Sequence, residues 1–197
     1  MSQDRIAAHF RSSLDGLTKA VQSDELLATT HAIARTVADA LKAGNKLLLI
    51  GNGGSAADAQ HIAAEIVGRY KQERPGWAAI ALTTDTSALT AIANDYGFEQ
   101  IFARQVQGLA RRGDVLFALT TSGRSPNILA ALKTARDLGV TTVGFTGAKG
   151  ESMRASCDHL FVAPTDDTPV VQQIHMMAMH AICDDVEQAL IGAPKIA

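Results

Sequence analysis

The sequence predicts a five-stranded, parallel, doubly wound α/β/α sandwich that is preceded by two helices. KLLLI (46–50) is a short unbroken apolar run, as expected of a strand buried on both faces. Four further strands are predicted at AAIAL (78–82), DVLFAL (114–119), TTVGFT (141–146) and HLFVA (159–163). Segments with helical patterning separate these runs. Alternating strands and helices imply right-handed crossovers and a parallel sheet that is covered on both faces.

The two leading helices are predicted from apolar spacing and from capping residues. Residues 4–22 form an amphipathic helix, because their apolar residues are spaced four, four, three and four apart: Ile6, Phe10, Leu14, Leu17 and Val21. A second helix runs from Asp24, which can cap it, to Ala43, and Gly44 terminates it. We expect both helices to extend the core rather than belong to it, with the apolar stripe buried against the body or another subunit.

The remaining helices are expected between the strands, at 55–69, around 86–93, at 99–111 and at 126–138. A long last helix begins near Thr168, because Thr followed by Pro169 is a strong start pattern. In sheets of this type, ligands bind beyond the carboxyl ends of the strands. The two most informative loops of the sequence fall there.

The composition bounds the class of protein. With 197 residues and no linker-like stretch, the chain fits a single domain, 1–197, consisting of a helical extension, 1–44, and the sandwich, 45–197. Hydrophobic residues make up 47% and charged residues 19% of the chain, as in soluble globular proteins. The net charge of −2 and the scattered basic residues argue against a nucleic-acid partner.

The same sequence indicates a cytoplasmic protein with no membrane partner. The N-terminus lacks the apolar core of a signal peptide, and no segment approaches the roughly 18 consecutive apolar residues of a membrane span. Cys157 and Cys183 match no metal or redox spacing, so we expect two reduced cysteines.

The first informative loop, GNGGSAADAQHIAAE, follows the first strand. Gly51, Gly53 and Ala56 satisfy the loose dinucleotide-binding template, but the nearest acidic residue at the end of the second strand, Asp85, lies 34 positions past Gly51 rather than about 20. We therefore do not predict a dinucleotide. His61 and Glu65 share one helix face at i, i+4, where they could hold one divalent ion or simply hydrogen-bond to each other.

The second loop, TTSGRSPNI, leads from the third strand into a helix. It places four hydroxyl groups around Gly123 at a helix N-terminus, where free N–H groups and the helix dipole favour a phosphate: those of Thr120, Thr121, Ser122 and Ser125. The plainer alternative is an ordinary N-cap, which Ser125 before Pro126 would satisfy alone. Because no Walker lysine is present, the loop favours a phosphorylated metabolite over a nucleoside triphosphate.

The motifs GNGGSAADAQH, NDYG, TTSGRS and QQIHMMAMH together resemble the sugar isomerase (SIS) domain, whose sandwich is flavodoxin-like, and more narrowly the bacterial phosphoheptose isomerases. The resemblance implies interconversion of sedoheptulose 7-phosphate and D-glycero-D-manno-heptose 7-phosphate. That reaction is the first step toward ADP-heptose and the heptoses of lipopolysaccharide. It also implies a homotetramer with sites built from adjacent subunits, and one Zn²⁺ per subunit.

The resemblance also implies roles for individual residues. The metal and catalytic positions match His61, Glu65, Gln172 and His180, with Glu65 and His180 as base and acid. Substrate-binding positions match the first loop, a later helix, the hydroxyl loop and three residues that lie elsewhere: Asn52, Gly53, Gly54, Ser55, Asn94, Asp95, Thr120, Thr121, Ser122, Ser125, Glu65, Arg69 and Gln172. Many members read STSG where this chain reads Thr120 to Gly123, and the Thr hydroxyl retains phosphate binding.

Several alternatives stay open at the level of sequence. Gln172 and His180 are eight residues apart, about 12 Å along a regular helix, so they bind one ion only if the helix is distorted, or else serve different roles or subunits. His31 and His175 are expected to be structural, and the run GRYKQERPG to be mostly a solvated turn. The rival function is a non-enzymatic SIS protein that binds the replication initiator DnaA; a sugar-phosphate sensor would need a DNA-binding domain for which the chain has no room.

Overall fold

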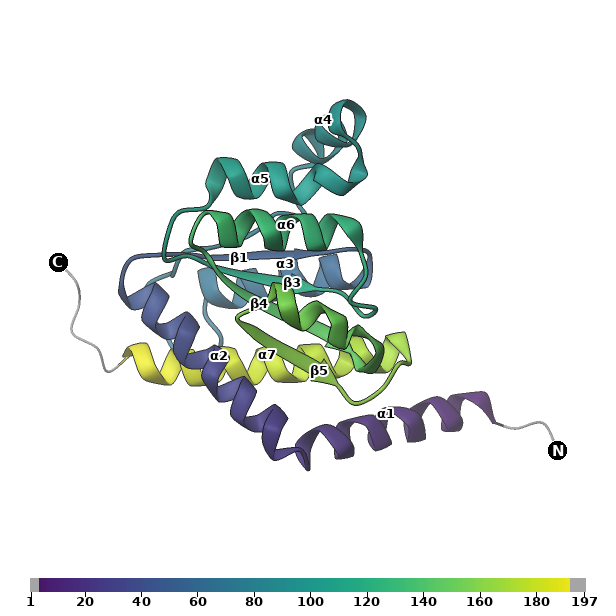
Figure 1. The fold of residues 1–197 in the computed structure, drawn as a ribbon. Coiled ribbons are helices and arrows are strands. Elements are labelled where there is room, and N and C mark those ends of the chain that lie inside the picture. The colour runs from purple at the N-terminus through teal and green to yellow at the C-terminus, as the bar shows by residue number, and fades with distance from the viewer. Residues whose placement is uncertain (1–3, 192–197) are drawn as a thin grey trace.

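The computed structural model describes residues 4–191, and the ends of the predicted domain, 1–3 and 192–197, lie outside the described residues. A five-stranded parallel sheet in the order β2-β1-β3-β4-β5 forms its centre (Figure 1). The strands are β1 (Leu47–Gly51), β2 (Ala79–Ala81), β3 (Val115–Leu119), β4 (Thr141–Gly147) and β5 (His159–Ala163). This order is the flavodoxin-like one, so the predicted fold class is confirmed.

Helices cover both faces of the sheet. One layer contains α1 (Arg5–Val21), α2 (Asp24–Lys42), α3 (Gly54–Val67) and α7 (Thr168–Ile191). The other contains α4 (Thr86–Tyr96), η1 (Phe98–Gln100), α5 (Ile101–Leu109), α6 (Pro126–Asp137) and η2 (Ala148–Ser156). Alternate strand residues serve the two layers: Leu49 and Phe117 face the first, and Leu48 and Leu116 face the second.

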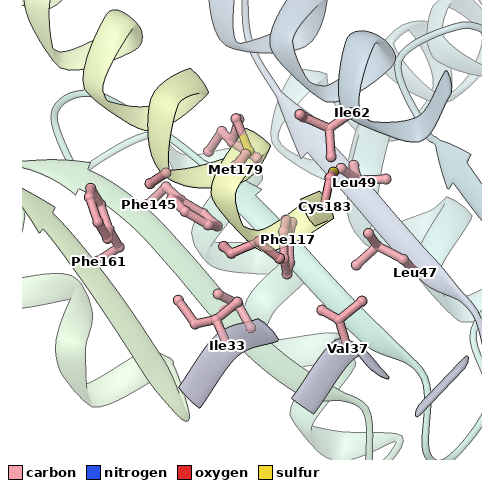
Figure 2. Close-up of a cluster of buried hydrophobic side chains, with 14 of the residues drawn as sticks. Ile33, Val37, Leu47, Leu49, Ile62, Phe117, Phe145, Phe161, Met179 and Cys183 are labelled. Carbon is pink, nitrogen blue, oxygen red and sulfur yellow. The ribbon is translucent and has the colours of Figure 1, made fainter. Parts of the chain in front are cut away.

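The core beneath α7 is built from large apolar side chains of several elements. Phe117, Phe145 and Phe161 from three neighbouring strands pack against Met179 of α7 and Ile33 of α2 (Figure 2). Complete burial of these groups is the main favourable term that holds the layer on the sheet. The layer is thereby fixed, and with it the two helices, α3 and α7, that carry the predicted acid, base and metal residues.

The two leading helices differ from each other in a way that the sequence did not reveal. Ile33 and Val37 of α2 are buried in the core, so α2 belongs to the sandwich rather than extending it, and that part of the prediction is wrong. The reason is that α7 does not cover the whole of this sheet face, and the apolar side chains of α2 bury the part next to β5. By contrast, α1 leaves Phe10 70% exposed and packs on α7 mainly through Gly16, where a Cβ would lie 2.6 Å from Val170.

Most element boundaries lie within two residues of the prediction. Ser23, not Asp24, caps α2, since its Oγ accepts a hydrogen bond from the Leu26 N–H at 3.3 Å. Gly44 follows α2 with φ +81°, as expected of a terminator. The segment 148–156, for which no helix was predicted, forms η2. Within residues 4–191 no helix is both long and apolar enough to cross a membrane.

Candidate active site

The glycine-rich turn after β1 lets α3 start close to the sheet. Gly53 has φ +55°, a conformation that side chains disfavour, and a Cβ at Gly51 would collide with the backbone of Ser55. Ser55 itself is buried in the first turn of α3. Asp85, the acidic residue that a dinucleotide would need, instead caps α4 by accepting a hydrogen bond from the Ala88 N–H at 2.9 Å.

Helices α3 and α7 lie side by side and run in the same direction. Gly54, the first residue of α3, lies against the side-chain amide of Gln172, and a Cβ there would collide with that amide. Two turns further along both helices, the Nε2 atoms of His61 and His180 are 3.1 Å apart. The two helices therefore meet through polar groups at two successive places: Gln172 at Gly54, and His180 at His61.

Around the contact between His61 and His180 lies a cluster of three groups that can bind a metal ion. Nε2 of His61 lies 3.1 Å from the Glu65 carboxylate, and one ligand atom from each of His61, Glu65 and His180 lies within 4.8 Å of the other two. Two imidazoles and a carboxylate are a ligand set found in catalytic zinc sites, which keep a fourth position open. The donor set therefore fits a divalent metal ion. The side chain of Glu65 retains 24% exposure, so the cluster can be reached from solvent.

The surroundings favour a neutral His180. Burial lowers its pKa below the ordinary histidine value, the nearby His61 lowers the pKa further, and Glu65 opposes both effects. The ring of Tyr70 stacks on that of His180, with centroids 5.6 Å apart and an angle of 23° between the planes. A neutral imidazole can bind a metal ion or accept a proton, both of which the predicted roles require.

Gln172 is not part of the His61–Glu65–His180 cluster, because it lies two turns earlier on α7. It lines an open groove of about 520 Å³ between α3 and α7, together with Asp58, Pro169, Gln173, Met176 and Met177. Burial raises the pKa of Asp58, and the neighbouring His61 opposes this rise. A sugar chain with its hydroxyl groups could lie in this groove, in contact with Gln172.

The hydroxyl loop after β3 is not an ordinary N-cap. Ser125 occupies the cap position of α6, but its side chain makes no capping hydrogen bond; its Oγ lies 3.1 Å from the Thr120 hydroxyl instead. Gly123 has φ +67° and lies so close to Gly150 that a Cβ would come within 2.6 Å of it. The first turn of α6 is therefore left without a serine cap, and free N–H groups at a helix N-terminus favour an anion such as phosphate.

The two predicted loops are joined to each other. The side-chain amides of Asn52 and Asn127 exchange two hydrogen bonds, at 3.0 and 2.8 Å, and Asn127 is buried. In the hydroxyl loop, the Thr121 carbonyl accepts from the Gly147 N–H, and the Ser122 hydroxyl accepts from the Arg124 N–H. This exchange uses one N–H and one oxygen lone pair of the Asn52 amide, so its second N–H and second lone pair remain for a ligand.

The other predicted site residues lie apart from the cluster. Arg69 is 57% exposed and its Nε lies 3.7 Å from the Glu73 carboxylate. Asn94 and Asp95 are exposed near the end of α4, where the Asn94 amide donates to the Asp95 carboxylate at 2.7 Å. Helix α4 belongs to the layer on the opposite face of the sheet from α3 and α7 (Figure 1). Among residues 4–191, neither Asn94 nor Asp95 is hydrogen-bonded to His61, Glu65 or His180.

Sequence reasoning missed residues that support the cluster from behind. The run GRYKQERPG was predicted to be mostly solvated, but Arg74 is only 3% exposed and bonds to the fully buried Glu187. Tyr70 from the same run stacks on His180. No local pattern marks these residues, because their partners are more than 100 positions away in the chain. Of the residues expected to be structural, His175 is buried, as predicted, and His31 lies exposed on α2.

Comparisons with known proteins place this geometry in a family. Residues 9–147 match the model of the SIS domain. A phosphoheptose isomerase of Bradyrhizobium sp. (strain BTAi1) is 62% identical over 190 residues, which cover 96% of each chain. One of Trichlorobacter lovleyi is 54% identical over 168 residues, which cover 85% of this chain and 86% of the relative.

Solved structures agree with the sequence comparison. Phosphoheptose isomerase GmhA from Neisseria gonorrhoeae has a TM-score of 0.88 and 41% identity, covering 95% of this chain and 100% of that one. A phosphoheptose isomerase from Francisella tularensis has a TM-score of 0.89 and 35% identity, covering 95% and 99%. The chain therefore belongs to the SIS-domain family and, within it, to the phosphoheptose isomerases.

Proposed function

We propose that this chain is an aldose–ketose isomerase that interconverts sedoheptulose 7-phosphate and D-glycero-D-manno-heptose 7-phosphate. The observation that carries the proposal is the His61–Glu65–His180 cluster, found in a chain that is 62% identical to a phosphoheptose isomerase over nearly its whole length. The reaction would be the first step toward ADP-heptose and lipopolysaccharide heptose. We infer a cytoplasmic location for it, as the sequence suggests.

The reaction requires a proton to move between C1 and C2 of an open-chain sugar through an enediol. The hydroxyl loop, with Thr120, Thr121, Ser122 and Ser125, would hold the phosphate and so fix the reacting carbons. The Glu65 carboxylate would take the proton from one carbon and return it to the other. His180 would give a proton to one sugar oxygen and take one back from the other, through the ring nitrogen that does not face the cluster.

We further propose that one Zn²⁺ per subunit is held by His61, Glu65 and His180, and that Gln172 faces the ion or the sugar from the adjoining groove. When bound, the ion would supply a Lewis acid for the negative charge that develops on the sugar oxygen. The residues of the chain then have the tasks of orienting the sugar and moving the protons. Asn52, Gly53, Gly54, Ser55 and Arg69 remain proposed substrate contacts.

The proposed assembly is a homotetramer in which adjacent subunits complete each site. Two observations support it. Asn94 and Asp95 lie on α4, in the opposite layer from the cluster, which favours a contact with the substrate of another copy. The apolar stripe of α1 is exposed in a single chain, with Ile6 at 73% and Phe10 at 70%. The proposed unit is the single domain 1–197, with α2 as part of the sandwich.

An isomerase assay tests the proposed function directly. Purified protein is incubated with sedoheptulose 7-phosphate, with and without zinc, and aldose and ketose products are separated by chromatography. We expect conversion that Glu65→Gln reduces by about 10²–10⁴-fold, the range of general acid–base catalysis, without altering the assembly. The matched control is Glu25→Gln, the same change on the exposed face of α2.

Two outcomes would contradict the proposal in different ways. Wild-type rates in Glu65→Gln would show that the assigned base is wrong. No conversion by the wild type, together with tight binding to the replication initiator DnaA, would favour the rival hypothesis of a non-enzymatic SIS protein.

A further inference from the structure

The segment between α3 and β2 is attached to α7 by a buried ion pair. Nε of Arg74 lies 2.9 Å from the Glu187 carboxylate, and the two side chains are 3% and 0% exposed. Replacing one partner of a buried pair is costly, but the pair itself adds little net stability over apolar residues of equal size. A buried ion pair fixes the positions of its two side chains. The other contacts of Arg74 and Glu187 therefore indicate which parts of the chain the pair holds in place.

Glu187 holds one end of this segment through its backbone. Three successive N–H groups, those of Tyr70, Lys71 and Gln72, donate to its carboxylate at 3.1, 2.8 and 2.9 Å. Burial alone would raise the pKa of Glu187, but these donors and Arg74 lower the pKa overall, so the carboxylate stays charged. The backbone at Tyr70 is thereby fixed to the last part of α7.

Arg74 holds the other end, at the C-terminus of α3. Its Nη2 donates to the Glu65 carbonyl at 2.7 Å, and its Nη1 donates to the Ile66 carbonyl at 3.0 Å. Carbonyl groups in the last turn of a helix lack partners within the helix, and the guanidinium satisfies them. The guanidinium also stacks on the Trp77 ring, 3.7 Å from its centroid. The turn of α3 that carries Glu65 is therefore fixed by Arg74.

The two ends meet again at the His61–Glu65–His180 cluster. The Tyr70 ring, whose backbone Glu187 holds, stacks on His180. The chain of contacts runs from Glu187 on α7 through Tyr70 to His180 on the same helix, and through Arg74 to Glu65 on α3. The buried ion pair thus reaches both residues to which the acid–base chemistry is assigned: Arg74 contacts Glu65 directly, and Glu187 reaches His180 through Tyr70.

We propose that Arg74, Glu187 and Tyr70 are positioning residues that set the distance and orientation of Glu65 and His180. This inference rests on the proposed function, because the geometry it concerns is that of the proposed acid–base and metal cluster. Partners that orient metal ligands from outside the first coordination sphere typically change metal affinity or activity by about 10–100-fold when they are lost.

The most direct test replaces the Tyr70 ring, which leaves the buried ion pair intact. We expect Tyr70→Leu to lower kcat and to weaken zinc binding, each by about 10–100-fold, with KM changed less than about twofold. Zinc affinity is measured by competition with a chromogenic chelator. Tyr70→Phe, which keeps the ring, should behave like the wild type in both measurements.

The matched control is Lys133→Met, which removes an exposed cation away from Tyr70. Lys133 pairs with Asp137 within α6, at 2.7 Å, on the opposite face of the sheet, and exposed pairs contribute little. It should leave kcat and zinc affinity at wild-type values. If Tyr70→Leu lowers the melting temperature but leaves kcat and zinc affinity unchanged, the residue is only structural and the proposal is wrong.

Arg74→Lys tests the second arm of the proposal. It keeps the positive charge but cannot reach both the Glu187 carboxylate and the Glu65 carbonyl, so it should lower kcat and weaken zinc binding in folded protein. Wild-type values for both would overturn the role of Arg74. An inactive wild type would refute the proposed function. Zinc affinity is measured without turnover, so it would still show whether Tyr70 and Arg74 position the His61–Glu65–His180 cluster.

Discussion

At the scale of single residues, His175 shows how burial fixes a protonation state. It is completely buried, its Nε2 lies 3.1 Å from the Thr146 carbonyl, and the rings of Phe145 and Phe161 flank it. Its Nδ1 has no hydrogen-bond partner among the described residues. A second proton would place an unpaired charged N–H in an apolar core, so burial lowers the pKa of His175 to about 4.

This low pKa makes the stability of the protein depend on pH in a defined window. As pH falls from 6.5 to about 4, the unfolded chain takes up a proton that the folded chain refuses. The free energy of unfolding therefore falls across the window, by about 3 kcal/mol from this residue, and the full contribution is present above it. His175→Gln keeps an N–H donor but cannot titrate, so its stability should fall less steeply.

Urea unfolding of wild type and His175→Gln at several pH values between 4 and 7 checks this expectation. His31→Gln, at an exposed histidine, is the control for the loss of an imidazole. Parallel curves for the wild type and His175→Gln would show that His175 is not the source of the pH dependence.

The residues of the candidate site could be predicted from the sequence only where the pattern is local. His61 and Glu65 are four apart on one helix, so their contact follows from helix geometry. Tyr70, Arg74 and Glu187 could not be found in this way, because a polar run looks solvated until its partner, 113 to 117 residues later, is known. The family resemblance supplied His180 and Gln172, but the different surroundings of these two residues became visible only in the structure.

At the scale of elements, Ser125 occupies the N-cap position of α6, but its side chain makes no capping hydrogen bond. Replacing a capping serine with alanine usually costs about 1 kcal/mol. Ser125→Ala should cost less, because no capping hydrogen bond is lost, yet it should weaken binding of inorganic phosphate and raise KM for the sugar phosphate. Removing one hydrogen bond to a charged group corresponds to about 1.5–3 kcal/mol, or roughly 10–100-fold in affinity.

Thermal unfolding and phosphate inhibition, measured on the same samples, separate the two effects. The control is Ser23→Ala, since Ser23 does cap α2 through the Leu26 N–H. That variant should lose stability and keep its phosphate inhibition. The opposite result, with Ser125→Ala unstable and normally inhibited, would mean that the loop is an ordinary cap.

The elements themselves could be predicted where apolar patterns are strong. All five strands were found because short apolar runs alternate with helical segments along the sequence. The segment 148–156 was missed because its sequence, AKGESMRAS, has no apolar periodicity, and Met153 is its only large buried side chain. The role of α2 was misjudged because an amphipathic helix looks the same whether its apolar face covers a sheet or another subunit.

At the scale of the whole molecule, α1 exposes an apolar stripe that a single chain does not cover. Ile6, Phe10 and Leu14, spaced four residues apart, are 73%, 70% and 67% exposed, while the opposite side of α1 packs on α7 through Gly16. Isolated exposed apolar residues are common, but an ordered stripe along one helix marks an interaction surface. We expect this stripe to contribute to the proposed homotetramer.

Phe10→Glu should therefore dissociate the assembly without unfolding the chain. Burying a phenylalanine is worth about 1.5–3 kcal/mol, so its loss alone weakens each contact by roughly 10–100-fold, and symmetry repeats that loss in every copy. Light scattering coupled to gel filtration gives the mass, and circular dichroism gives the fold. Ser12→Glu adds the same charge two residues away, about 200° around the helix, and should leave the mass unchanged.

If the isomerase site is completed by a neighbouring copy, activity should fall with the mass in Phe10→Glu and recover at high protein concentration. A Phe10→Glu protein with the wild-type mass would show that α1 takes no part in assembly, and a fully active monomer would show that each site is complete within one chain.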